Sequence, residues 1–76
     1  MMEMILYKTF TLTLKEENIS KRLLFELRKI FISYPGEEGV CLKILEKNTG
    51  EAKYLELHGY KVDPCVSFLT EIMYKI

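Results

Sequence analysis

The sequence predicts an α+β fold, a two-layer sandwich in which two helices cover one face of a small mixed sheet, in the order β-α-β-β-(β)-α. Three patterns predict it: an alternating segment near the start, two segments with helical spacing of apolar residues, and a turn motif between two further alternating segments. A helical crossover makes the first two strands parallel, and a hairpin makes the next pair antiparallel. With 76 residues, 49% of them hydrophobic, we expect a single domain over residues 1–76.

The first expected element is a strand from Met4 to Leu14. Its apolar side carries Met4, Leu6, Phe10, Leu12 and Leu14, and its other side carries Thr9, Thr11 and Thr13. This alternation predicts one buried and one polar face. At the start of the strand, the threonine side also carries the apolar residues Ile5 and Tyr7. They are interpreted either as a local docking surface or as ordinary exposed apolar residues.

A helix is expected next, within residues 15–34. Its apolar stripe consists of Ile19, Leu23, Leu24, Leu27, Ile30, Phe31 and Tyr34. Asn18 or Ser20 can serve as its N-cap. Pro35 discourages a helical conformation at the residue before it, and Gly36 permits a left-handed or tight turn, so the segment ends the helix and leads into a strand.

The following segment predicts a hairpin. Val40, Leu42 and Ile44 alternate with Cys41, Lys43 and Leu45, residues 47–50 form the turn, and Tyr54, Leu55 and Leu57 lie on the returning strand. His58 and Gly59 break this strand, and residues 60–62 are expected to form a short extra one. The helices should cover one side of the sheet and leave a face rich in threonine and lysine open.

The last expected element is a helix that begins at Asp63 and Pro64, because a capping side chain followed by proline is typical of a helix start. One face of this helix carries Cys65, Phe68, Leu69, Ile72, Met73 and Ile76. This face is expected to pack on the sheet beside the first helix.

The charge balance argues against independent nucleic-acid binding, because eleven basic residues offset eleven acidic ones. Lys21, Arg22, Arg28 and Lys29 are interpreted as a solvated helix face, although they form a local basic patch. The start of the chain lacks the pattern of a signal peptide, and no apolar run approaches the length of a membrane span. We therefore expect a cytoplasmic location and no membrane partner.

The residues that could carry chemistry are few. His58 is the only histidine, and a Cys-His nucleophile or a zinc site would need it to meet Cys41 or Cys65 in space. The cysteines are interpreted as small buried hydrophobic residues and His58 as a loop residue. The isolated glycines do not form a phosphate loop. The sequence thus predicts no catalytic, cofactor-binding or metal-binding residue, and neither a cofactor nor a small-molecule ligand.

The segments LYKTFTLTL, LLFELRKIFISYPG, GVCLKI and KVDPCVSFLTEI occur in an order that is similar to a known family. The chain resembles the C-terminal domain of the alpha (catalytic) subunit of bacterial DNA polymerase III over about residues 5–75. The matching positions are Tyr34, Pro35, Gly36, Val40, Leu42, Val62, Pro64 and Leu69. They correspond to structural positions of the family and to none of its catalytic residues.

The resemblance implies a separated C-terminal domain of a larger polymerase chain, which acts in DNA replication as a non-catalytic protein-interaction module. Its implied partner is the tau subunit of the clamp loader, and the DNA-directed polymerase (nucleotidyltransferase) site would lie elsewhere in the parent protein. Two departures are Gly39, where the family often has proline, and the end at Ile76, where the family commonly continues into a tail implicated in tau contact. The alternative is a free-standing small α/β adaptor or regulator that self-associates through its open sheet face.

Overall fold

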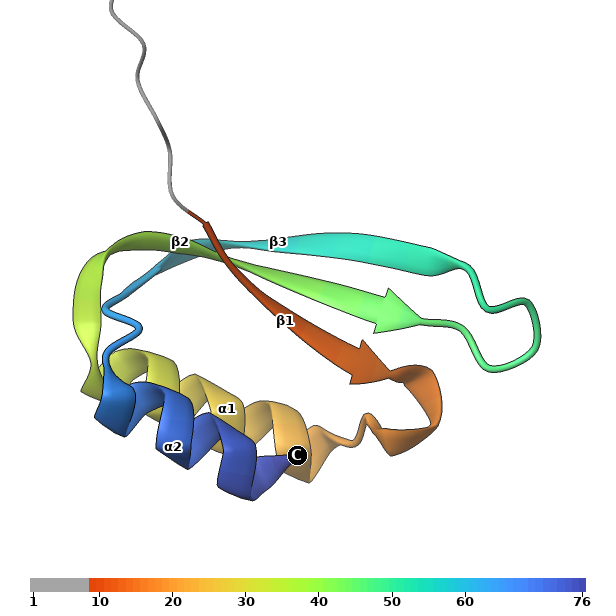
Figure 1. Ribbon diagram of the computed structural model, residues 1–76, viewed down its shortest axis with the longest axis horizontal. Helices are drawn as coiled ribbons and strands as arrows, with labels where there is room; N and C mark the ends of the chain where they lie inside the picture. Colours follow the sequence, from red (N-terminus) through yellow and green to blue (C-terminus); the bar gives the residue numbers. More distant parts are fainter. Residues whose placement is uncertain (1–8) are drawn as a thin grey trace, which may run out of the picture.

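A computed structural model describes residues 9–76 and confirms the α+β prediction, with a three-stranded mixed sheet and two helices in the order β-α-β-β-α. The elements are β1 (Thr9–Lys15), a 3-10 turn η1 (Glu16–Asn18), α1 (Lys21–Ser33), β2 (Pro35–Leu45), β3 (Ala52–Val62) and α2 (Val66–Lys75). Figure 1 shows both helices side by side on the same side of the sheet. The two-layer arrangement follows because each helix has one apolar side to bury.

The strand order in the sheet is β1-β2-β3. β1 pairs in parallel with β2 without interruption, from Thr9 opposite Gly39 to Lys15 opposite Leu45. The burial of Leu12 and Leu14 and the exposure of the threonines confirm the alternation predicted for this part of the strand. Residues 4–8, which were expected to extend the strand and which include Ile5 and Tyr7, lie outside the described residues.

The hairpin between β2 and β3 forms as predicted. Its turn is closed by hydrogen bonds from Glu46 N to the carbonyl of Glu51 (2.8 Å) and from Gly50 N to the carbonyl of Glu46 (3.1 Å). Gly50 has a φ of 72°, a left-handed conformation that glycine adopts without a steric penalty. The end of the hairpin projects beyond the helices (Figure 1). Tyr54 pairs with Lys43 on the open face of the sheet and is 65% exposed, and Leu55 on the same edge strand is 50% exposed.

The expected break at His58 and Gly59 is wrong. β3 continues to Val62, and residues 60–62 are its last part rather than an extra strand. Pairing shifts from Val40 opposite Leu57 to Gly39 opposite Lys61, so three residues of β3 bulge out of the ladder. Gly59 lies in this bulge with a φ of 90°. A glycine at positive φ allows the strand to accommodate extra residues without ending the pairing.

The start of α1 agrees with the prediction, whereas the start of α2 does not. Ser20 is the N-cap of α1, because its Oγ accepts a hydrogen bond from Leu23 N at 3.0 Å. The expected start of the last helix at Asp63 and Pro64 is wrong, since α2 begins at Val66 with Cys65 as its N-cap. The carbonyl of Asp63 accepts from Cys65 N at 2.8 Å, which indicates that the chain first makes a tight turn.

The core lies between the helices and the sheet. It consists of Leu12, Leu14, Leu27, Ile30, Phe31, Val40, Leu42, Val62, Phe68 and Ile72. Leu27 and Phe68 therefore belong to the same layer, as predicted. Phe68 is the aromatic centre of this core, with ring-centroid distances of 5.0 Å to Phe10, 6.2 Å to Phe31 and 5.8 Å to Tyr34.

The predicted apolar stripes of both helices are wider than the surfaces that the fold buries. The stripe residues that are exposed, contrary to expectation, are Leu24, Leu69, Met73 and Ile76. A helix in a two-layer fold buries only the arc that faces the sheet and its neighbouring helix. The outer flanks of α1 and α2 have no covering layer among residues 9–76, so apolar residues remain on the surface there.

Candidate functional site

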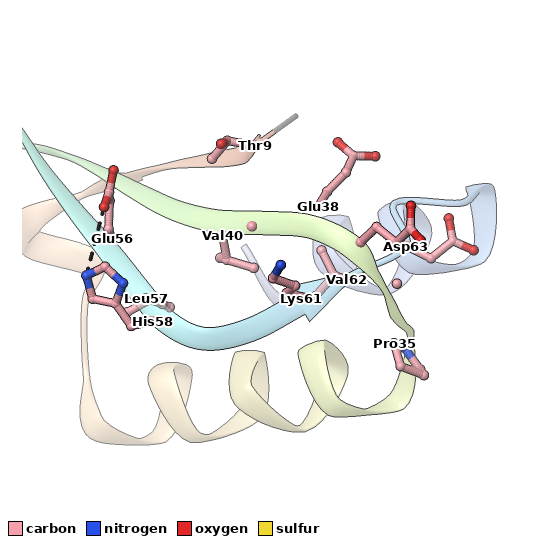
Figure 2. Close-up of a pocket in the computed structure, with 13 residues that line it drawn as sticks. Thr9, Pro35, Glu38, Val40, Glu56, Leu57, His58, Lys61, Val62 and Asp63 are labelled. Carbon is pink, nitrogen blue, oxygen red and sulfur yellow. Dashed lines mark ion pairs between the residues drawn. The ribbon is translucent and has the colours of Figure 1, made fainter. Parts of the chain in front are cut away.

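A hollow of about 700 Å³ lies where β2 and β3 bend around the bulge. Figure 2 shows its lining residues, which come from Thr9 of β1, the start of β2, the bulged part of β3 and the chain just before α2. The shift in register separates the two strands here. The hollow is therefore a consequence of the bulge, open to solvent on one side.

The side chains around this hollow do not converge. Glu56 and His58 lie at one end in Figure 2, whereas Glu38 and Asp63 lie at the other. His58 Nε2 is 3.9 Å from a Glu56 carboxylate oxygen, and the His58 side chain is 89% exposed. Solvent weakens such an exposed pair to well under 1 kcal/mol. A general base or a metal site needs preorganised groups at a common point, which this hollow does not provide.

The three residues considered for thiol or zinc chemistry are not brought together. Cys41 lies on the open face of the sheet, where its Sγ contacts the carbonyl of Leu42 at 3.9 Å. Cys65 packs against the core on the opposite side of the sheet. Both cysteines are free thiols, and no hydrogen bond within residues 9–76 joins either to His58. Over the same residues, no group of three His, Cys, Asp or Glu side chains could hold a metal ion.

A structural junction joins the two segments that carry the family resemblance. Asp63 N donates a 2.8 Å hydrogen bond to the carbonyl of Tyr34, which links the end of α1 to the chain that follows β3. Gly36 lies directly against the backbone of Val62, where a Cβ atom would stand 2.5 Å from the Val62 carbonyl carbon. Gly36 is therefore needed for close approach. Of the two expected conformations, left-handed or tight turn, the left-handed one is wrong, since only Gly50 and Gly59 have positive φ among the described residues.

Tyr34 also anchors α2 at this junction. Its hydroxyl donates a hydrogen bond to Glu71 Oε2, and this bond raises the pKa of Tyr34, with partial burial and the charges of Glu71 and Cys65 adding to the effect. The neutral phenol is thus favoured in the folded state relative to the unfolded chain.

This raised pKa predicts an alkaline loss of stability. A pKa that is higher in the folded state contributes stability that is fully present below the ordinary tyrosine value of about 10 and is lost as the pH rises through the folded-state value. Urea unfolding between pH 8 and 11 should therefore show a steeper alkaline decline for the wild type than for Tyr34→Phe. Tyr74→Phe, which removes an exposed hydroxyl from α2, should retain the wild-type slope. Equal slopes for the wild type and both variants would contradict the assignment.

The flank of α1 that points away from α2 combines apolar and basic side chains. It consists of Lys21, Leu24, Phe25, Arg28 and Ile32, and we call it the α1 outer face. The spacing of three, four and seven residues places these side chains on one side of the helix. Phe25 is 56% and Ile32 60% exposed, and Lys29 lies 5.0 Å above the Phe25 ring.

The corresponding flank of α2 is entirely apolar. It consists of Val66, Leu69, Met73 and Ile76, and we call it the α2 outer face. Val66 is 80% and Met73 75% exposed. The opposite flank of α2 faces α1, where Lys75 Nζ lies 3.5 Å from a Glu26 carboxylate oxygen.

Sequence reasoning missed both outer faces. It assigned Leu24, Leu69, Met73 and Ile76 to buried stripes and did not single out Phe25. The signal was nevertheless present, because each helix carries apolar residues over a wider arc than one sheet and one neighbouring helix can cover. Contiguous exposed apolar residues of this kind mark interaction surfaces more often than single ones do.

The comparisons with known proteins found no family model, no curated protein and no solved structure that matches this chain. Neither α1 nor α2, the helices that the structure describes, is long and apolar enough to span a bilayer.

Proposed function

We propose that this chain is a non-catalytic protein-interaction module of a bacterial replicative DNA polymerase, and that it attaches the polymerase to the tau subunit of the clamp loader. The observation that carries the proposal is the α1 outer face, where Phe25 and Ile32 are more than half exposed beside Arg28. Attachment of this kind raises the local concentration of a polymerase at the fork without adding chemistry.

The structural junction supports the resemblance on which the partner is chosen. The resemblance rests on two motifs that lie more than twenty residues apart in the sequence. The first consists of Tyr34, Pro35 and Gly36, and the second contains Val62 and Pro64. The contact of Gly36 with Val62 brings the two motifs together in space. The matched residues thus form one connected feature that fixes how α1, β2, β3 and α2 meet, which is a reason for a family to retain them together.

The chemistry of the α1 outer face suggests the kind of segment that it binds. Its apolar centre suits the apolar side of an amphipathic helix, and Lys21 and Arg28 on the same face favour acidic residues on that helix. Buried aromatic residues contribute most to such contacts, so Phe25 is the expected anchor.

The test is a binding measurement by calorimetry between the full chain and the purified tau subunit encoded in the same genome. We expect Phe25→Glu to weaken binding by about tenfold or more, because it places a carboxylate in the apolar centre of the interface. Met73→Glu, the same type of change on the α2 outer face, should leave binding unchanged. Absence of binding by the wild-type chain, or equal binding by the wild type and Phe25→Glu, would refute the proposal.

The alternative, a free-standing adaptor that self-associates through the open sheet face, has less support. That face carries Thr11, Thr13 and Lys43, and the Lys43 ammonium lies 5.9 Å from the centre of the Tyr54 ring. Burying its polar groups against a second polar face would cost free energy that few apolar contacts offset.

A further inference from the structure

We propose that two copies of this chain associate side by side through the free edge of β1 and the α2 outer face. This inference goes beyond the proposed function and uses the opposite flank of the molecule from the α1 outer face. Three features support it. The edge of β1 is unprotected, the α2 outer face beside it carries no charge, and a two-fold axis would pair each of these surfaces with the same surface of a second copy.

The first feature is the edge of β1. β1 is the outermost strand, and within residues 9–76 no strand pairs with its other side. Edge strands usually carry proline, lysine or a bulge that prevents pairing with another chain. β1, with the sequence TFTLTLK, has no proline, no charge before Lys15 and no interruption in its register with β2. The other edge strand, β3, is protected by its bulge at Gly59 and by Lys53 and Lys61.

The second feature is the α2 outer face, which lies on the same flank as β1. The ring of Phe68 on α2 contacts the ring of Phe10 on β1, with 5.0 Å between centroids. In Figure 1, β1 and α2 are both nearest to the viewer, with β2 and α1 behind them. The four residues of this face recur at intervals of three and four, which is the spacing of a helix that packs along another helix. None of the four is charged.

The third feature is the match that a two-fold axis through Leu12 would produce. Antiparallel pairing of two β1 strands would place Phe10 opposite Leu14 on the helix side and Thr11 opposite Thr13 on the open side. Thr9 would face Lys15, so no like charges meet. The same rotation would bring the α2 outer faces together in antiparallel orientation, with each apolar residue facing another.

The lack of charged side chains on the α2 outer face favours a second copy of this chain as the partner that binds this flank. In a two-fold interface each charged side chain lies near its own counterpart, so a symmetric contact must avoid like charges. The β1 edge and the α2 outer face meet that condition. The α1 outer face does not, because Lys21 and Arg28 would face their own counterparts across a two-fold axis. The contact area, a seven-residue strand edge and four side chains per copy, is small for a stable dimer. We expect dissociation constants of roughly 10–100 µM.

The experiment is sedimentation velocity of the full chain at concentrations from about 5 to 500 µM, which brackets the expected affinity. The weight-average mass should rise from the monomer value of 9.0 kDa toward twice that value. Met73→Glu should remain a monomer over the whole range, because it places a carboxylate in a contact formed with its own copy. Phe25→Glu, the matched change on α1, should dimerise like the wild type. Thermal melts of both variants check that the fold is retained, which the exposure of both side chains predicts.

A mixing experiment tests the two-fold arrangement itself. Met73→Lys should also be monomeric alone, and an equimolar mixture of the glutamate and lysine variants should form a mixed dimer. A wild-type chain that stays monomeric at all concentrations would overturn the proposal. So would dimerisation of Met73→Glu at wild-type affinity, or failure of the mixed variants to associate. Loss of tau binding in Phe25→Glu with normal dimerisation separates this proposal from the proposed function.

Discussion

Phe68→Ala is expected to remove a large part of the stability of this domain. The Phe68 side chain is fully buried and contacts Phe10, Phe31 and Tyr34, so its removal leaves a cavity among three aromatic rings. Truncation of a buried phenylalanine costs about 3–5 kcal/mol. A domain of 76 residues has a total stability of about 4–11 kcal/mol. Urea unfolding monitored by circular dichroism should therefore show a midpoint far below that of the wild type.

Met73→Ala is the matched control for this measurement. Met73 lies on the same helix, and its side chain is mostly exposed, so its truncation should change the free energy of unfolding by less than about 0.5 kcal/mol at concentrations where the chain is monomeric. Similar losses for Phe68→Ala and Met73→Ala would contradict the placement of α2, since they would mean that neither flank of this helix is the buried one.

Gly36→Ala is expected to cost about 3 kcal/mol, the upper end of the range for overpacking. A Cβ atom at this position would stand 2.5 Å from the carbonyl carbon and oxygen of Val62 and 2.6 Å from Asp63 N. These are backbone atoms, so they cannot rotate away as a side chain can, and Val62 is fully buried. Movement of Asp63 would also stretch the hydrogen bond from its N–H to the carbonyl of Tyr34.

Gly39→Ala is the control, because the same substitution three residues later in β2 meets no atom within 4 Å. This variant should unfold at nearly the wild-type urea concentration, whereas Gly36→Ala should unfold at a clearly lower one. Equal midpoints would show that β2 and the end of β3 do not approach as closely as the contact of Gly36 with Val62 requires. Both variants replace a glycine of β2 by alanine, so the change in intrinsic strand propensity is nearly the same in both and cancels in the comparison.

The elements of this fold were predictable because they depend on neighbours in the chain. The alternation around Leu12 and the helical spacing around Leu27 are local patterns, and both are confirmed. Of the two N-cap candidates, Asn18 and Ser20, the structure shows Ser20. The hairpin turn at Gly50 also follows from a few adjacent residues. The sequence thus predicted the layers, the parallel and antiparallel pairs, and the two residues, Leu27 and Phe68, that share the core.

The two outer faces were not predictable, because exposure is decided by what covers a residue and not by the residue itself. Leu24 and Met73 have the spacing of core residues and are exposed, since no further layer of residues 9–76 lies over those flanks. The roles of Gly36 and of the bulge at Gly59 also depend on segments distant in sequence. The sequence by itself determined the secondary structure and the apolar sides. Only the tertiary structure decided which apolar residues stay on the surface, because that depends on whether another element of residues 9–76 packs over them.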